Sequence, residues 1–288
     1  MRRVFDKMVT KVKEYPDDKK MSQFLTIVKE QIVDKKWITL LMGGMIGGMA
    51  FVVIAMIGEM DFEALMAGFP PELMAIFGLD DFSNPYSFLS VEVFTIIWML
   101  VGIYLITFTS LIVPQEIEEK TMELLLSKPI TRTKYLSAKI VSIYVIIAIL
   151  LAIGFLMTSG FLPLSPDFVE EGLYFDRLWA AYVAVVLFLG LISMFTLFCS
   201  TIFLHSKKAM VLGIVVLFVM FFIDGFYGYL EELENLKWFT IFYYYDPTAY
   251  LVDPDLAYYI RDLIVLASGN IVFLIGSLVV FNKKDIPN

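Results

Sequence analysis

Six apolar runs of about twenty residues constrain this sequence more than any other feature. A bilayer core about 30 Å thick is crossed by about 20 apolar residues in an α-helix. A soluble chain of 288 residues has no room to bury several such runs, and 59% of this chain is hydrophobic, against about 45–50% in soluble domains. The sequence therefore predicts an all-α integral membrane protein with spans at 38–57, 93–113, 140–162, 178–204, 209–230 and 263–281.

The loop charges predict how these spans are oriented. If the amino-terminal segment is cytoplasmic, 19 of the 22 Lys and Arg residues lie on that side, and the outer side holds only Arg177, Lys237 and Arg261. Cytoplasmic loops are enriched in Lys and Arg, so both termini are expected in the cytoplasm and the protein in the cell membrane. The outer loops are then 58–92, 163–177 and 231–262. No apolar segment of the signal-peptide kind precedes the first span, which is expected to act as its own insertion signal.

Two parts are expected: a cytoplasmic arm with an interfacial helix at 1–37, and a six-helix transmembrane domain at 38–288. Phe24, Ile27, Val28 and Ile32 share one helical face, which favours a helix lying in the inner interface. The alternative is a plain helical extension of the first span. In the last outer loop, the tyrosine-rich stretch 242–259 is typical of the headgroup layer, which makes membrane lipids expected neighbours. A lid over a substrate exit is the alternative for that stretch.

Several chemistries are excluded by missing motifs. There is no G-x-x-x-x-G-K-[ST] phosphate loop, so the chain does not bind ATP through that motif. His205 is the single histidine, which excludes H-E-x-x-H zinc sites, and Cys199 is the single cysteine. No G-x-S-x-G motif occurs. We therefore expect no enzyme activity, no cofactor or metal in this chain, and no nucleic-acid partner.

Two features within the spans are candidates for packing or for a translocation path. Gly43 and Gly47, like Gly44 and Gly48, have the small-xxx-small spacing that permits close helix contact, either within the chain or across a dimer. Asp224 is an acid deep within the fifth apolar run. Intramembrane carboxylates face a partner or water because burial in lipid is costly. Asp224 is thus expected either to line a path or to be reached by outer water.

A dense polar insert, PQEIEEKTMELLLSKPITRTKYLSAK at 114–139, separates the second and third spans. Proline favours helix boundaries, so a helix is expected from Gln115 to Ser127, with a new helix capped by Thr131 or Thr133. The helix has an acidic stripe and an apolar one, formed respectively by Glu116, Glu119 and Glu123, and by Ile117, Thr121, Leu124 and Leu125. Such an insert suits force transmission from a cytoplasmic partner. The alternative is a solvated loop.

This insert resembles the signature of ABC-2-type exporter permeases, in which a Glu-x-Glu-x-Gly-Thr-like run is followed by leucines, Ser-x-Pro, an Arg and a Lys. The matching residues are Glu116, Glu119, Thr121, Glu123, Leu124, Leu125, Leu126, Ser127, Pro129, Arg132 and Lys139. Lys120 stands where the family often has glycine. The six-span layout and the long first outer loop are similar to the family across the whole chain.

The resemblance implies that the insert is a coupling helix docking on a separate cytoplasmic ATPase, which binds ATP and Mg. It further implies a permease that works as a dimer, a homodimer or a heterodimer, with the path between the copies. The expected docking residues are Glu116, Glu119, Thr121, Glu123, Leu124, Leu125, Pro129 and Arg132, with Lys139 and Arg132 as alternative braces of the insert. Three rival functions are a secondary transporter or channel, a membrane anchor that holds an ATPase without transport, and an intramembrane enzyme. Only Asp224 suggests the first, and no catalytic set suggests the third.

Overall fold

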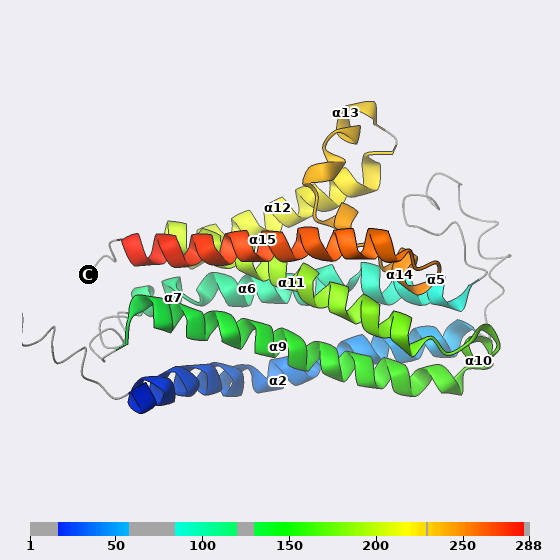
Figure 1. Ribbon diagram of the computed structural model, residues 1–288, viewed down its shortest axis with the longest axis horizontal. Helices are drawn as coiled ribbons and strands as arrows, with labels where there is room; N and C mark the ends of the chain where they lie inside the picture. The colour runs from blue at the N-terminus through cyan, green and yellow to red at the C-terminus, as the bar shows by residue number, and fades with distance from the viewer. Residues whose placement is uncertain (1–16, 58–83, 120–129, 229, 285–288) are drawn as a thin grey trace, which may run out of the picture.

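The structure, a computed structural model, describes residues 17–57, 84–119, 130–228 and 230–284. Every regular element within these residues is helical, and six spans lie side by side along the long axis of the molecule (Figure 1). The predicted all-α class and six spans are therefore confirmed. The spans are α2 (Asp17–Ile57), the series α5 to α7 (Pro85–Glu118), α9 (Arg132–Phe161), α11 (Phe175–Phe203), α12 (Ser206–Phe226) and α15 (Leu256–Lys283).

α2 is one unbroken helix of 41 residues, without a break at the boundary expected near residue 37. Its amino-terminal half packs beside α9: Ile27 and Ile32 contact the apolar core, and Lys139 Nζ donates to Gln31 Oε1 over 2.6 Å. The structure thus corresponds to the alternative, a helical extension of the first span. Gln31, four residues after Ile27, thus has a polar partner on α9.

The second span is not a regular α-helix. It begins with α5 (Pro85–Leu89), continues through two π-helical stretches, η1 (Ser90–Thr95) and η2 (Trp98–Gly102), and ends with α6 (Ile103–Leu111) and α7 (Pro114–Glu118). π-Helical turns are rare and occur often at functional sites. Here the Tyr245 hydroxyl donates to the Phe94 carbonyl of η1 over 3.0 Å. A side chain from a distant segment therefore satisfies a carbonyl in the irregular part of the span.

α11 lies at the centre of the bundle, where it contacts α6, α9, α12 and α15. In the most apolar stretch of α11, 72% of the residues are buried inside the chain. In the corresponding stretches of α12 and α15 the buried share is 17%. Many exposed side chains of those two helices are large and apolar, for example Val215 and Phe222 on α12 and Ile264 and Val272 on α15. In a membrane such faces contact lipid or another apolar protein surface.

The chain between α12 and α15 folds back into the bundle. It passes through α13 (Glu231–Glu234), η4 (Lys237–Phe239), η5 (Phe242–Tyr244) and α14 (Pro247–Leu251). The Thr240 hydroxyl donates to the Met220 carbonyl of α12 over 3.1 Å, and the rings of Phe242 and Trp98 lie 5.5 Å apart. α13 stands out sideways from the bundle beside α12 (Figure 1). At the end of the bundle where α14 lies, α9 continues through η3 (Leu162–Leu164) into α10 (Pro166–Glu171).

Candidate functional site

The polar insert begins at one end of the bundle, where the described chain also starts and ends (Figure 1). α7 starts with Pro114 at its first position and ends at Glu118, and Glu119 follows with φ −83° and ψ 0°. The first part of the expected helix from Gln115 to Ser127 is thus present as α7, and residues 120–127 lie outside the described residues. Five of the expected docking residues lie outside the described residues: Thr121, Glu123, Leu124, Leu125 and Pro129.

Glu116 is held inside the chain. Its Oε1 lies 2.9 Å from Lys139 Nζ, and its Oε2 accepts a hydrogen bond from the Tyr135 hydroxyl. The same ammonium group donates to Gln31 Oε1 of α2. The side chains of Lys139 and Glu116 are only 12% and 18% exposed, so water screens this pair far less than a surface pair. We call these four residues the inner cluster; it joins α7 to both α9 and α2.

Glu118 and Glu119 are exposed, unlike Glu116. Glu119 Oε1 accepts from Gln115 Nε2 over 2.7 Å, a contact one turn long on the surface of α7. Glu118 Oε1 lies 3.3 Å from the Ser206 hydroxyl and 3.4 Å from the Ser206 backbone nitrogen, at the start of α12. The acidic stripe expected from the sequence is thus divided: Glu116 faces the bundle, and Glu119 faces away from it.

Arg132 does not pair with these carboxylates. It is the first residue of α9, which Thr131 caps by accepting from the Lys134 backbone nitrogen, so the expected cap is confirmed. Arg132 Nη1 donates to the Lys284 carbonyl over 2.8 Å, and Lys284 Nζ donates to the Ile202 carbonyl over 2.9 Å. These bonds join the ends of α9, α15 and α11. The end of the insert is therefore bonded to α15 and, through Lys284, to α11.

No group of three or more His, Cys, Asp or Glu residues that could hold a metal ion occurs in the described part of the chain. The polar residues at the α7 end hold one another and the helix ends. Glu118 and Glu119 form an exposed acidic edge beside these bonded residues.

A family model described as ABC-2 family transporter protein matches residues 7–286, which is nearly the whole chain. The chain belongs to the ABC-2 transporter family. This confirms the resemblance carried by the polar insert, and it makes the protein the permease subunit of an ABC transporter and a multi-pass membrane protein. Comparison with curated proteins and with solved structures gave no match.

The glycines of the first span in this ABC-2 protein divide into two faces. A Cβ atom added to Gly43 would lie 2.7 Å from the Leu150 carbonyl oxygen, and one added to Gly47 would lie 2.5 Å from Met157. No atom lies within 4 Å of a Cβ added to Gly44 or Gly48. Gly43 and Gly47 therefore form the close α2–α9 contact within the chain, and the other pair faces away from it.

Asp224 lies near the end of α12 farthest from α7, and its side chain is half-buried. Its carboxyl group interacts electrostatically with Asp246, which caps α14 by accepting from the Ala249 nitrogen over 3.0 Å. Asp224 thus has Asp246, an acid of the folded-back segment, as an electrostatic neighbour in the ABC-2 protein.

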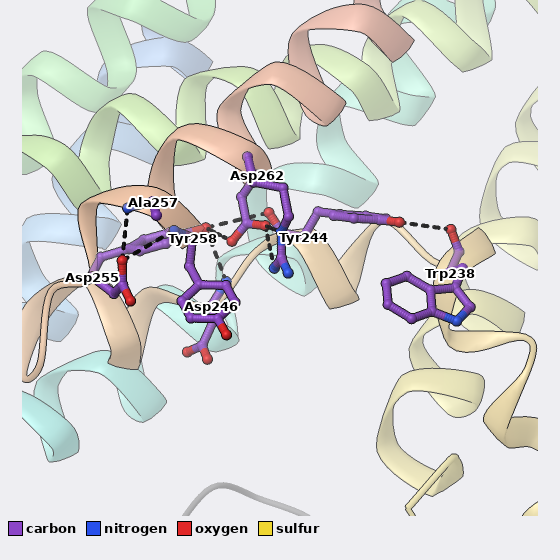
Figure 2. Close-up of polar contacts among 9 residues, drawn as sticks. Trp238, Tyr244, Asp246, Asp255, Ala257, Tyr258 and Asp262 are labelled. Carbon is purple, nitrogen blue, oxygen red and sulfur yellow. Dashed lines mark hydrogen bonds and ion pairs between the residues drawn. The ribbon is translucent and has the colours of Figure 1, made fainter.

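A polar network at this far end was not predicted (Figure 2). Asp262, only 2% exposed, accepts from Arg261 Nε over 2.8 Å and from the Tyr250 hydroxyl over 3.1 Å. Burial, and then the charge of Asp262, raise the pKa of the Tyr250 phenol well above its ordinary value, so the hydroxyl keeps the proton that it donates. The sequence signal was Asp262 itself, a carboxylate at the start of an apolar helix.

A second unpredicted group lies in the middle of the bundle. Asn270 of α15 accepts from the Tyr144 hydroxyl of α9 over 2.6 Å and donates to the Leu187 carbonyl of α11 over 2.9 Å. One amide thus links three spans. The sequence feature that could have predicted this contact is an asparagine inside an apolar run. Polar side chains within membrane helices commonly form hydrogen bonds between helices.

Proposed function

We propose that this ABC-2 permease exports its substrate as half of a dimer, driven by a separate cytoplasmic ATPase that docks on the insert 114–139. The ATPase would bring ATP and Mg, because this chain has no phosphate loop. The alternative partner in the membrane is a related permease rather than a second copy. The observation that carries the proposal is the division of the α7 carboxylates: Glu119 is exposed, and Glu116 is bonded to α9 and, through Lys139, linked to α2.

This division suits the transmission of motion. A force applied at Glu119 or beyond acts on α7, and the inner cluster passes it to α9 and α2 through hydrogen bonds to charged groups, which are about twice as strong as neutral ones. Arg132 and Lys284 do the same for α15 and α11 at the other end of the insert. A loop that was merely solvated would need neither set of bonds.

Reversing the exposed charge tests the docking surface. We expect Glu119→Lys to weaken co-purification of the ATPase or to uncouple ATP hydrolysis from transport, because it reverses a charge at the interface. Among the described residues the substitution removes one exposed hydrogen bond, so the permease should still fold. Asp34→Lys, an equal charge change on the exposed side of α2, is the matched control. If both variants retain the complex and its ATPase rate, the insert is not the docking surface.

The proposed orientation has its own test. In a Cys199→Ala background, a cysteine replacing Lys207 should be protected from an impermeant maleimide in intact cells, and one replacing Asp253 should react. Both positions are exposed, and they lie at opposite ends of the bundle. The loop charges require this pattern. Labelling at 207 with protection at 253 would invert the topology and remove the ATPase from the α7 end.

A further inference from the structure

Toward the end of the bundle opposite α7, several aromatic side chains cluster around two cationic side chains. Lys237 Nζ lies 5.5 Å from the Tyr227 ring centre and 5.4 Å from that of Trp238. The Arg261 guanidinium carbon lies 5.0 to 5.8 Å from three ring centres, those of Tyr258, Tyr243 and Tyr244. Tyr243 joins the two halves, since its ring lies 5.0 Å from Trp238. We call these seven residues the cationic aromatic patch.

The two cations of the patch still have N–H groups that can donate to a bound anion. Arg261 directs Nε and Nη2 at one oxygen of Asp262, which leaves other N–H donors of its five for a further acceptor. Lys237 lies 3.8 Å from Glu234, whose side chain is 65% exposed, and such surface pairs contribute little. Arg177, the other cation predicted on this side, differs: its Nη1 donates to the carbonyls of Leu251 and Val252.

Exposed apolar side chains surround the cations. Trp238 is 53% exposed and Phe239 is 76% exposed, and Leu230 and Leu236 on the same segment are also exposed. This segment projects sideways from the bundle, short of the end that α10 reaches (Figure 1). If the bundle axis crosses the bilayer, this projecting segment lies within one leaflet. Apolar and cationic side chains next to each other are complementary to an anionic lipid, which has an apolar chain and a negatively charged headgroup.

The neighbouring carboxylates whose side chains the structure describes leave donors of both cations available. Asp262 is buried and is already bonded to Arg261 and Tyr250, and the exposed Glu234 carboxylate lies 3.8 Å from Lys237. Asp224 and Asp246 interact with Tyr227, on the side of the patch that faces α12 and α14. The exposed side of the patch is therefore formed by aromatic rings and by the two cations, with Glu234 beside Lys237.

We propose that the cationic aromatic patch binds the phosphate group of an anionic phospholipid, with Leu236, Trp238 and Phe239 among its acyl chains. Arg and Lys are the usual ligands of phosphate, and aromatic rings with polar edges lie at headgroup depth. The leaflet concerned, the outer one, rests on the orientation under the proposed function. The phosphate site itself does not depend on that orientation.

Trp238 is a built-in reporter for the test. The protein is placed in nanodiscs of phosphatidylcholine containing an equal mole fraction of either dibrominated phosphatidylglycerol or dibrominated phosphatidylcholine. The quenching of Trp238 is taken as the difference from the Trp238→Phe variant. We expect markedly stronger quenching by the brominated phosphatidylglycerol, with enrichment of about five-fold per cation. Lys237→Gln and Lys237→Gln/Arg261→Gln should reduce it stepwise, and Lys208→Gln, at the other end of the bundle, should not.

Three results would overturn the proposal. Equal quenching by both brominated lipids means that the segment lies in the membrane without selecting phosphate. No quenching by either lipid means that another protein surface, such as a second copy, covers the patch. Loss of the selectivity on adding inorganic phosphate means a site for a soluble anion.

Arg261→Gln leaves Asp262 without its cation, so the single Lys237→Gln variant decides the outcome if the double variant fails to fold. Nanodiscs present the same lipids on both faces and need no ATPase, so this result is separate from the tests of orientation and docking.

Discussion

Replacing Lys139 with methionine should destabilise the protein by about 1.5–3 kcal/mol, the range for losing a hydrogen bond to a charged group. Lys139 contacts both Glu116 and Gln31, so its loss breaks the link between α7 and α2 and leaves the largely buried Glu116 carboxylate without its cation. The measurement is the midpoint of thermal unfolding in detergent or nanodiscs. In the complex with the ATPase, the same variant should hydrolyse ATP without transport.

The double variant Glu116→Gln/Lys139→Met is the control for this prediction. Removing one partner of a buried pair costs more than removing both charges, because the remaining charge is left uncompensated. We expect the double variant to be more stable than Lys139→Met alone. If the two single effects simply add in the double variant, Glu116 and Lys139 are not coupled, and the inner cluster does not join α7 to the spans.

Gly43→Ala should also lower stability, by about 1–3 kcal/mol, the usual cost of overpacking a core. The new Cβ atom would meet the Leu150 backbone oxygen and Ile153 Cβ, at 2.7 and 2.9 Å. Backbone cannot rotate away, so α2 and α9 would have to separate along their contact. Unfolding midpoints of the purified variants measure the effect.

Gly44→Ala is the matched control, one residue away in the same helix. Its Cβ atom meets nothing within 4 Å, and alanine favours a helix over glycine by roughly 0.5–1 kcal/mol, so stability should hold or rise. Gly47→Ala should lie between the two, since its nearest atoms belong to the flexible Met157 side chain. Equal effects at 43 and 44 would contradict the α2–α9 contact.

The spans could be predicted because each depends on one local property, an apolar run long enough to cross a bilayer. Thr131 was found as a cap for the same reason, since capping involves only neighbouring residues. The small-residue spacing identified Gly43 and Gly47 together with Gly44 and Gly48, but spacing alone does not say which face of α2 meets α9.

The features that were missed depend on contacts between distant segments. Glu116 faces inward because Tyr135 and Lys139, some twenty residues later, lie one turn apart on α9 and meet it there. The π-helical stretch of the second span is accompanied by Tyr245, which bonds to Phe94 from 151 residues away. Asn270 joins α9 and α11 in the same way. No local pattern reports such partners, although a polar residue within an apolar run signals that one exists.

Photo-crosslinking from position 119 tests the central claim most directly. A benzoylphenylalanine residue replaces Glu119 on the exposed side of α7, and a second variant carries it at Asp253, exposed at the other end of the bundle. Both are expressed in the cells to which the protein belongs, and the crosslinked proteins are identified by mass spectrometry. The account predicts a light-dependent crosslink from position 119, and not from 253, to a protein with a G-x-x-x-x-G-K-[ST] phosphate loop. Failure of position 119 to capture such an ATPase, or equal capture from 253, would contradict it.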